Sequence, residues 1–382
     1  MQSIFSERSF ASVMRAGDAF QFDIDLKKDR DKIIQDASKA ALSGLIDLTK
    51  FNSSFVNNKP CITYGDYTTH LLLRSLTRHL RRRARIRTYG RDQIVRGVIE
   101  TLLDATPMHC IRRDITSFYE TLPIEPIRDR LIYDTTSSTL ARNYIKQFFD
   151  THCAKTQYIG LPRGIGLSAL LAEMAMRDFD QSVRSQAGVF KYYRFSDDII
   201  VFTMADPSTL EQYMTNSLPG VMQFNSSKSK TYELAKSGGP SSADLEYLGY
   251  LFRTTNLKPR ADSREVRVAI ASKKIKRLKT RIILSLNDMT KTKDGALFED
   301  RVRFLSSNYR VKRQGNDHVR HGPHVYSGIF YNYKMCGGYA VKKGVMLETL
   351  YDGAELKALD GFYHSILKAP SSGRKPLIPS KR

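Results

Sequence analysis

The stretch KYYRFSDDIIVFT, from Lys191 to Thr203, places two adjacent carboxylates between apolar runs that favour β-structure. We expect a β-hairpin whose turn carries Asp197 and Asp198. Aspartate favours turns on its own account, so the pair alone indicates no more than a solvent-exposed turn. Whether the pair takes part in chemistry depends on the side chains that the fold brings beside it.

A second apolar run, MHCIRRD, predicts a strand that ends at Asp114 and leads into a turn and a helix. Between it and the hairpin lies GLPRGIGLSALLAEMAMRDFD, whose glycines and proline predict a tight loop before a helix from Ser168 to Asp180. Carboxylates from separate strands of one sheet can hold two Mg²⁺ ions about 3.5 to 4 Å apart, the geometry for in-line phosphoryl displacement. Oxygen ligands in basic surroundings favour Mg²⁺ over zinc.

The chain carries a large basic excess. Its 61 lysine and arginine residues against 39 acidic ones give a formal charge of +22 over 382 residues. This charge is spread along the sequence and favours a polyanion as partner; the alternatives are a merely soluble surface or attraction to anionic lipid. No run reaches the roughly 18 apolar residues of a membrane span, and the start MQSIFSERSF lacks a signal-peptide core. We therefore expect no membrane attachment.

Cysteine and histidine spacing gives little sign of zinc. The four cysteines stand far apart without a CxxC pair, as is typical of free thiols in a reducing compartment, and we expect a cytoplasmic protein. His318, His321 and His324 are spaced by three, but Gly322 and Pro323 interrupt any helix there. This cluster is either a zinc site or, as we prefer, a basic loop that contacts RNA.

Arginines crowd the helix-like segment from Leu71 to Glu100. Those at 74, 78, 81 and 85 would share one helix face. A face covered by salt bridges would need acidic residues, and there are none between positions 71 and 91. We therefore predict that Arg74, Arg78 and Arg81 contact nucleic-acid phosphates.

A second basic helix is predicted from KKIKRLKTRIILSL, where apolar residues recur at helical spacing. The apolar seam would face the protein and the cations would face outward, toward an RNA or duplex backbone; a plain surface helix is the alternative. The predicted nucleic-acid contacts on this helix are Lys273, Lys276, Arg277 and Lys279.

Five short motifs follow one another in the order found in a known family. RRDITSFYETLP resembles the first catalytic palm motif of the reverse transcriptases, and GLPRGIGLS resembles their glycine-rich motif before the palm helix. FSDD is similar to their second catalytic motif, SKSKT to the lysine motif and YLGY to the primer-grip hairpin. The resemblance spans roughly residues 70 to 255. It implies an α+β, right-hand polymerase fold with fingers, an RRM-like palm sheet and a helical thumb.

The resemblance also assigns a metal site. It implies that Asp114 and Asp197 are the main Mg²⁺ ligands, with Asp198 close by and assisting, and that all three are catalytic. Ile115 is counted with the metal-binding positions. Two Mg²⁺ ions are implied, and Mn²⁺ is a possible substitute.

The implied nucleotide site centres on Tyr119. It matches the aromatic residue that lies under the sugar in this family and excludes a 2′-hydroxyl by its bulk, which implies the use of dNTPs. Phe118, Arg163 and Gly164 complete the site. Arg163 stands where many reverse transcriptases have glutamine, and Ser196 where many have alanine or valine. The added cation puts template choice and the manner of initiation in doubt, whereas the metal ligands are intact.

The resemblance leaves alternatives open for the cations that would bind the triphosphate. Arg85, Arg87 and Arg91 are candidates for the finger contacts, and the family pattern does not choose among them. By position only, Lys230, or else Lys228, is implied to lie near the leaving pyrophosphate.

The resemblance divides the chain into an N-terminal extension (1–65), fingers with palm (66–255), and a thumb with a basic helical extension (256–382). Within residues 1–65 we expect a short strand, then a helix, and no site. The implied activity is RNA-directed DNA synthesis from dNTPs on an RNA template.

Three further segments suggest the setting of that activity. MQSIFSERSF, YSGIFYNY and LDGFYHSIL are most similar to the smaller member of a bacterial phage-defence type in which two reverse transcriptases work together. This similarity implies a structured noncoding RNA and a second reverse transcriptase subunit as partners. The alternatives are a retron or intron-type reverse transcriptase, an RNA-dependent RNA polymerase, and a palm-fold scaffold that binds RNA without activity.

Overall fold

A computed structural model describes most of the chain, which divides into two compact units. The described residues are 3–15, 17–56, 58–152, 160–234, 244–254, 263–311, 325–342, 344–350 and 353–368. Unit 1 comprises Met1–Tyr89, Ile111–Thr231 and Lys312–Pro323, and unit 2 comprises Gly90–Cys110, Tyr232–Val311 and His324–Arg382. The units are not three consecutive segments, and the predicted borders after residues 65 and 255 stay predictions.

The N-terminal part of unit 1 is mostly helical. Its elements, in chain order, are α1 (Glu7–Ala11), α2 (Asp18–Gln21), α3 (Arg30–Leu42), β1 (Asn52–Val56), β2 (Lys59–Thr63) and α4 (Tyr67–Arg83). The prediction of one strand followed by one helix is therefore wrong. Apolar residues such as Phe5 and Phe10 are fully buried in one core with α3 and α4, so their spacing serves helix packing instead of a sheet.

The arginine-rich segment forms two helices, not the single helix predicted from Leu71 to Glu100. After α4, Arg85 adopts a left-handed φ of 52°, and α5 (Arg91–Leu103) begins behind Gly90. The N–H of Gly90 is bonded to the Gln93 side chain at 2.8 Å, which starts the new helix. The break falls where the chain passes from unit 1 to unit 2.

A four-stranded sheet carries the predicted carboxylates. Its order is β4-β5-β3-β6, and its strands are β3 (Met108–Asp114), β4 (Val189–Phe195), β5 (Asp198–Thr203) and β6 (Lys230–Leu234). The predicted hairpin is confirmed: β4 and β5 are antiparallel, Phe195 pairs with Asp198, and Ser196 in the turn has a φ of 57°. The run from Ile199 to Phe202 is fully buried, as expected of a strand covered on both faces.

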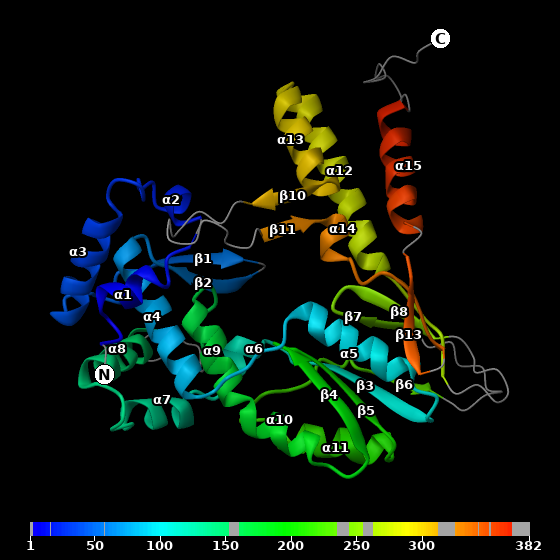
Figure 1. Cartoon of the computed structure of the whole chain (residues 1–382), viewed down its shortest axis with the longest axis horizontal. Helices are drawn as coiled ribbons and strands as arrows, with labels where there is room; N and C mark the ends of the chain where they lie inside the picture. Colours follow the sequence, from blue (N-terminus) through cyan, green and yellow to red (C-terminus); the bar gives the residue numbers. More distant parts are fainter. Residues whose placement is uncertain are drawn as a thin grey trace. The chain divides into compact units, whose positions relative to one another are not determined.

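Six helices lie between the strands of this sheet along the chain. They are α6 (Phe118–Thr121), α7 (Glu125–Ile132), α8 (Thr139–His152), α9 (Gly166–Ala175), α10 (Arg177–Arg184) and α11 (Pro207–Ser217). Of these, α10 packs against β4 (Figure 1). The single helix predicted from Ser168 to Asp180 is divided between α9 and α10 at Met176, whose fully buried side chain lies in the core of unit 1.

Unit 2 is built on a second sheet, with the order β13-β12-β9-β8-β7. Its strands are β7 (Asp244–Tyr247), β8 (Tyr250–Thr254), β9 (Val266–Ile270), β12 (Gly337–Lys342) and β13 (Val345–Thr349). A separate hairpin is formed by β10 (Asn308–Val311) and β11 (Val325–Gly328). The helices besides α5 are α12 (Ser272–Thr292), α13 (Gly295–Ser306), α14 (Ile329–Asn332) and α15 (Ala354–Lys368).

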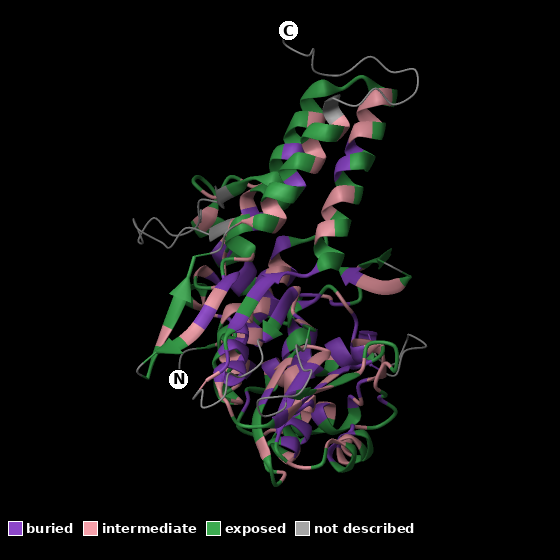
Figure 2. Ribbon diagram, turned by 90° about the vertical axis from the view of Figure 1, so that its right-hand side faces the viewer, coloured by how far each residue is buried: buried purple, intermediate pink, exposed green. Residues whose placement is uncertain are grey.

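The long helix α12 packs against α13 and α15. Ile282 is buried on this side, whereas Lys273, Lys276 and Arg277 are exposed, so the predicted amphipathic basic helix is confirmed. Figure 2 shows that these helices carry long exposed faces. The buried residues of the unit lie mainly in its sheet and in α5. Among the described residues, no helix combines the length and the apolar character needed to cross a bilayer.

Candidate active site

Main-chain hydrogen bonds bring the predicted carboxylates to one end of the four-stranded sheet. β3 ends at Asp114, and the next residue, Ile115, donates its backbone N–H to the carbonyl of Asp197 at 2.9 Å. On the other side, Asn225 donates its N–H to the carbonyl of Asp114 at 2.7 Å. The strand end and the hairpin turn are therefore fixed to each other through the backbone.

Burial and like charge act together on the two carboxylates at this junction. The side chain of Asp114 is almost fully buried. Burial raises the pKa of Asp197, and the negative charge of Asp114 raises it further. Two oxygen-ligand groups that repel each other in a partly desolvated place form a site that a divalent cation would stabilise.

Lys228 occupies the cationic position beside Asp114. Its Nζ lies 3.0 Å from Oδ1 and 3.0 Å from Oδ2 of the carboxylate, and about half of the lysine side chain is exposed. An ammonium group on both oxygens shows that this carboxylate accommodates a cation, so Asp114 fits a metal ligand. Of the two lysines considered, Lys230 lies exposed at the start of β6, and Lys228 is the one at the carboxylates.

Asp198 differs from its two neighbours. Arg112 of β3 donates from Nε to Oδ1 at 3.0 Å and from Nη2 to Oδ2 at 2.9 Å, a bidentate ion pair. Both oxygens of Asp198 are thus engaged, and in this conformation it is an ion-pair partner of the sheet. Within the described ranges, no group of three or more acidic, histidine or cysteine side chains has the arrangement of a metal site. The donor set that fits a metal consists of Asp114 and Asp197.

Tyr119 lies on the short helix α6, directly after β3. Phe118 is buried, and its ring meets the Tyr119 ring edge to face, with the centroids 5.2 Å apart. The guanidinium of Arg163 lies over the Tyr119 ring, 5.5 Å from its centroid. Tyr119 therefore contacts two other residues predicted for the nucleotide site, Phe118 and Arg163.

The glycine-rich loop reaches Tyr119 because it has no side chains at two positions. A Cβ on Gly160 would lie 2.0 Å from the carbonyl oxygen of Tyr119, to which Leu161 donates its N–H at 2.7 Å. Gly164 has a φ of +93°, and a Cβ there would lie 2.4 Å from the carbonyl oxygen of Ile62 in β2. The predicted tight loop thus packs between α6 and the β1–β2 hairpin.

Two residues that sequence reasoning missed join this group. Glu120 accepts from Arg163 at 2.5 and 3.2 Å, and Lys59 of β2 lies 3.7 Å from the same carboxylate. Burial acts to raise the pKa of Glu120, but the bonds from Arg163 outweigh it, and the pKa is lowered. The sequence offered one signal, the position of Glu120 directly after Tyr119. Its partners Arg163 and Lys59 are too distant in the chain to be recognised from the sequence.

Comparison with known proteins agrees with this geometry. Residues 76–252 match the family described as reverse transcriptase (RNA-dependent DNA polymerase). These residues are thus similar to a reverse transcriptase domain, which in that family is an RNA-directed DNA polymerase, a nucleotidyltransferase. The predicted α+β right-hand polymerase fold is confirmed. The comparison with curated proteins finds no match.

Among solved structures, two telomerases are similar to the chain. One is apo telomerase from Candida tropicalis truncated from its C-terminal domain, with 14% identity, a TM-score of 0.37, and coverage of 61% of this chain and 48% of that one. The other is telomerase from Candida albicans in complex with a TWJ fragment of telomeric RNA, with 15% identity, a TM-score of 0.33, and coverage of 56% and 41%. The chain spans less than half the length of both.

The arginines of α4 that were predicted to contact nucleic-acid phosphates differ in their partners: one binds a carboxylate, and the other two donate to a carbonyl or a hydroxyl. Arg74 binds Asp18 through both oxygens, at 2.6 and 2.9 Å, and both side chains are largely buried. This corrects the prediction for Arg74, whose acid lies 56 positions earlier and not within the segment. Arg78 donates to the carbonyl of Ser12 at 3.0 Å. Arg81 is held by a hydroxyl of the same segment, at 3.2 Å.

The three triphosphate candidates also differ. Arg85 and Arg87 are exposed. Arg91 donates to the carbonyls of Leu248 and Asn332, at 2.6 to 3.0 Å, and its guanidinium lies 4.6 Å from the ring of Tyr250. A guanidinium engaged in this way holds unit 2 together, which argues against Arg91 as a triphosphate ligand.

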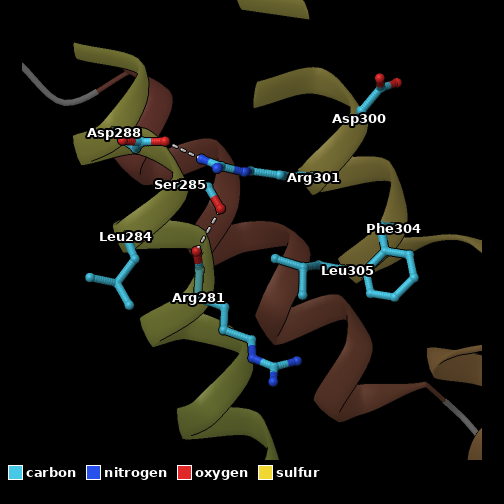
Figure 3. Close-up of a pocket in the computed structure, with 8 residues that line it drawn as sticks. All are labelled: Arg281, Leu284, Ser285, Asp288, Asp300, Arg301, Phe304 and Leu305. Carbon is cyan, nitrogen blue, oxygen red and sulfur yellow. Dashed lines mark hydrogen bonds and ion pairs between the residues drawn. The ribbon is translucent and has the colours of Figure 1, made fainter. Parts of the chain in front are cut away.

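The remaining predicted contacts belong to unit 2. On α12 the Nζ of Lys279 lies 4.7 Å from the ring centroid of Phe362 in α15, so this cation has a partner within the unit. A cavity of about 890 Å³ lies between α12 and α13 (Figure 3), lined by apolar residues such as Phe304 and by the ion pair of Arg301 with Asp288. None of the predicted site residues that the structure describes lines it. The predicted cluster of His318, His321 and His324 lies outside the described residues.

Proposed function

We propose that this protein is an RNA-directed DNA polymerase in which Asp114 and Asp197 hold the divalent ions. The observation that carries the proposal is the hydrogen bond between Ile115 N–H and the Asp197 carbonyl. It fixes two mutually repelling carboxylates at the same sheet end, within the reverse transcriptase domain. When bound, Mg²⁺, or Mn²⁺ in its place, would activate the attacking 3′-hydroxyl and stabilise charge on the leaving pyrophosphate.

The other side chains would orient the nucleotide. Lys228 would move from Asp114 to the phosphates once the carboxylate is neutralised, because its exposed stem allows the ammonium group to turn. Tyr119, pressed between Phe118 and Arg163, would form a rigid wall that excludes a 2′-hydroxyl and so selects dNTPs. Arg112 would hold Asp198 aside as a structural acid.

We further propose that the template is a structured noncoding RNA and that the protein acts in bacterial phage defence beside a second reverse transcriptase, in the cytoplasm. The motif similarity of MQSIFSERSF, YSGIFYNY and LDGFYHSIL and the charge of +22 support this setting. A retron or intron-type enzyme, and a scaffold that binds RNA without activity, are the alternatives.

The experiment is primer extension on an RNA template by the purified full chain, with Mg²⁺ and either dNTPs or rNTPs. We expect incorporation of dNTPs, and a loss of at least about 10³-fold in Asp197→Asn, because a metal ligand supplies several kcal/mol to the transition state. Asp178→Asn, which changes an exposed acid of α10, is the matched control and should remain active. Full activity of Asp197→Asn would contradict the proposed catalytic role.

Nucleotide choice is tested by Tyr119→Ala. We expect this variant to incorporate rNTPs more readily than the wild-type protein, since the aromatic wall is removed. If the wild-type protein used rNTPs as readily as dNTPs, the activity would be RNA synthesis and the proposal of DNA synthesis would be wrong.

A further inference from the structure

A polar cavity of about 410 Å³ lies between α1 and α4 in unit 1. Among the residues that the structure describes, its wall includes three arginines, a histidine and serines, and no acidic residue. The residues used below are Arg8, Ser12, Ser75, Arg78, His79 and Arg82. None of them belongs to the carboxylate site or to the group around Tyr119.

The two elements that form the wall are fastened to each other. The Ser75 hydroxyl of α4 donates to the carbonyl of Ile4, which precedes α1. Arg78, one turn further along α4, donates to the carbonyl of Ser12 at the end of α1 at 3.0 Å. The cavity is therefore formed before any ligand arrives, which lowers the ordering cost of binding.

The positive charge of this wall is not balanced by the part of the chain that the structure describes. There, no acidic side chain lies within ion-pair distance of Arg8, Arg78 or Arg82, whereas Arg74 on the same helix binds Asp18. Arg78 and Arg82 are four residues apart, a spacing at which like charges on a helix repel. Burial and the charge of Arg82 lower the pKa of Arg78, as expected for cations that lack a counter-ion.

One ring nitrogen of the wall has no hydrogen-bond partner among the described residues. Nε2 of His79 is buried, and no described residue forms a hydrogen bond with it. Burial lowers the pKa of His79, and the nearby Arg83 lowers it further, so the ring is neutral at pH 7. A neutral imidazole can donate one hydrogen bond, which suits an anionic oxygen.

The composition of the wall identifies the class of ligand. Guanidinium groups with no competing carboxylate favour phosphate, which they bind by paired hydrogen bonds. The volume falls within the roughly 300 to 1,000 Å³ of small-ligand sites, so more than one phosphate group has room. Within the described ranges, no phenylalanine, tyrosine or tryptophan lines the cavity to stack on a base. We propose that the cavity between α1 and α4 binds backbone phosphates of the RNA, at a site distinct from the polymerase carboxylates.

The test is RNA binding by the full chain, measured by fluorescence anisotropy with a 5′-hydroxyl RNA oligonucleotide, in EDTA and without nucleotides. The variant Arg8→Gln/Arg82→Gln removes two exposed cations of the wall. We expect about 10-fold weaker binding and a salt slope that is smaller by about 1 to 2. Arg130→Gln/Lys146→Gln removes two exposed cations from α7 and α8 of the same unit and is the matched control. It should bind RNA like the wild-type protein.

Three outcomes of the binding experiment would overturn the inference. Equal losses in the two double variants would mean that only the general positive field attracts RNA. A loss seen solely with 5′-phosphorylated RNA would make the ligand a terminal phosphate. Unchanged RNA affinity together with lost binding of inorganic phosphate or pyrophosphate, by calorimetry, would make the cavity a small-anion site.

The inference and the proposed function can fail separately. The inference rests on one part of the proposed function, namely that the protein binds RNA. Asp197→Asn should retain RNA binding without polymerisation, whereas Arg8→Gln/Arg82→Gln should extend primers at the wild-type rate once RNA is saturating. A double variant that is inactive even at saturating RNA would place the cavity within the active site and overturn its distinct role.

Discussion

The palm sheet and the cavity between α1 and α4 use arginine in opposite ways. In the sheet, Arg194 is 3% exposed and is bound by both Asp180 and Glu173, while Arg112 is bound by Asp198. In the cavity, the arginines line a wall without an acid. Arginine content alone therefore does not indicate a nucleic-acid contact. In these two regions, a carboxylate partner separates the arginines that build the fold from those available to a ligand. Arg91 shows that main-chain carbonyls can hold an arginine in the fold as well.

The largest effect is expected for Arg194→Met, because it leaves two carboxylates without their cation. Burial alone would lower the pKa of Arg194, but Asp180 and Glu173 outweigh it and raise the pKa. We expect the free energy of unfolding to fall by about 3 to 5 kcal/mol, measured by urea denaturation. Lys191→Met, an exposed cation of the same strand, should change it by less than about 0.5 kcal/mol. Equal losses of unfolding free energy in Arg194→Met and Lys191→Met would contradict the stabilising role of the carboxylate partners.

A smaller effect is expected for Arg74→Met, which tests the ion pair hidden within the arginine-rich helix. Burial acts to raise the pKa of Asp18, but hydrogen bonds from Arg74 and Tyr67 outweigh it, and the pKa is lowered. We expect a loss of about 2 to 3 kcal/mol at pH 7.

The pH dependence of this loss has a definite sign. A carboxyl with a lowered folded pKa contributes stability above its unfolded value of about 3.9, and this contribution is lost as the pH falls through the folded pKa. The difference between the wild-type protein and Arg74→Met should therefore narrow as the pH is lowered below about 4. A difference that is constant with pH would exclude the ion pair as its source.

The pair of Arg112 with Asp198 is expected to couple more weakly, since it lies nearer to solvent. A double-mutant cycle with Arg112→Met and Asp198→Asn should give a coupling of about 1 to 2 kcal/mol in the free energy of unfolding. Asp198→Asn should also retain more polymerase activity than Asp197→Asn in primer extension. A greater loss of activity in Asp198→Asn would place Asp198, and not Asp197, at the metal.

The smallest effect on stability is expected in the cavity. Arg8→Gln/Arg82→Gln removes two exposed cations that have no acidic partner among the described residues, so the free energy of unfolding should change by no more than about 0.5 kcal/mol. Relief of repulsion with Arg78 would make the change stabilising. A loss above about 1 kcal/mol, measured by urea denaturation, would show that these arginines build the fold after all.

The parts of the site that depend on local pattern were predictable from the sequence. The strand ending at Asp114, the hairpin with Asp197 in its turn and the loop around Gly164 all follow from apolar runs and turn residues. Each of these signals involves neighbours in the chain, whose preferences agree with the final fold.

The parts that depend on distant partners were not predictable. Asp18 neutralises Arg74 from 56 positions away, and Lys59 approaches Glu120 from another element. The break before Gly90 was also missed, because arginine-rich sequence is compatible with a continuous helix until a cap ends it. The choice between Lys228 and Lys230 likewise needed the geometry of the turn that precedes β6.

The hydrogen bond from Ile115 to Asp197 has a consequence for engineering. The two atoms that set the spacing of the carboxylates belong to the peptide chain, and every residue except proline supplies the same N–H donor. Apolar replacements at 115, and replacements at 196 by glycine, asparagine or aspartate, which tolerate the left-handed φ of 57° there, can therefore alter the surroundings of the site while its span is retained. A variant library at these two positions would explore template choice and fidelity with little risk to the catalytic framework.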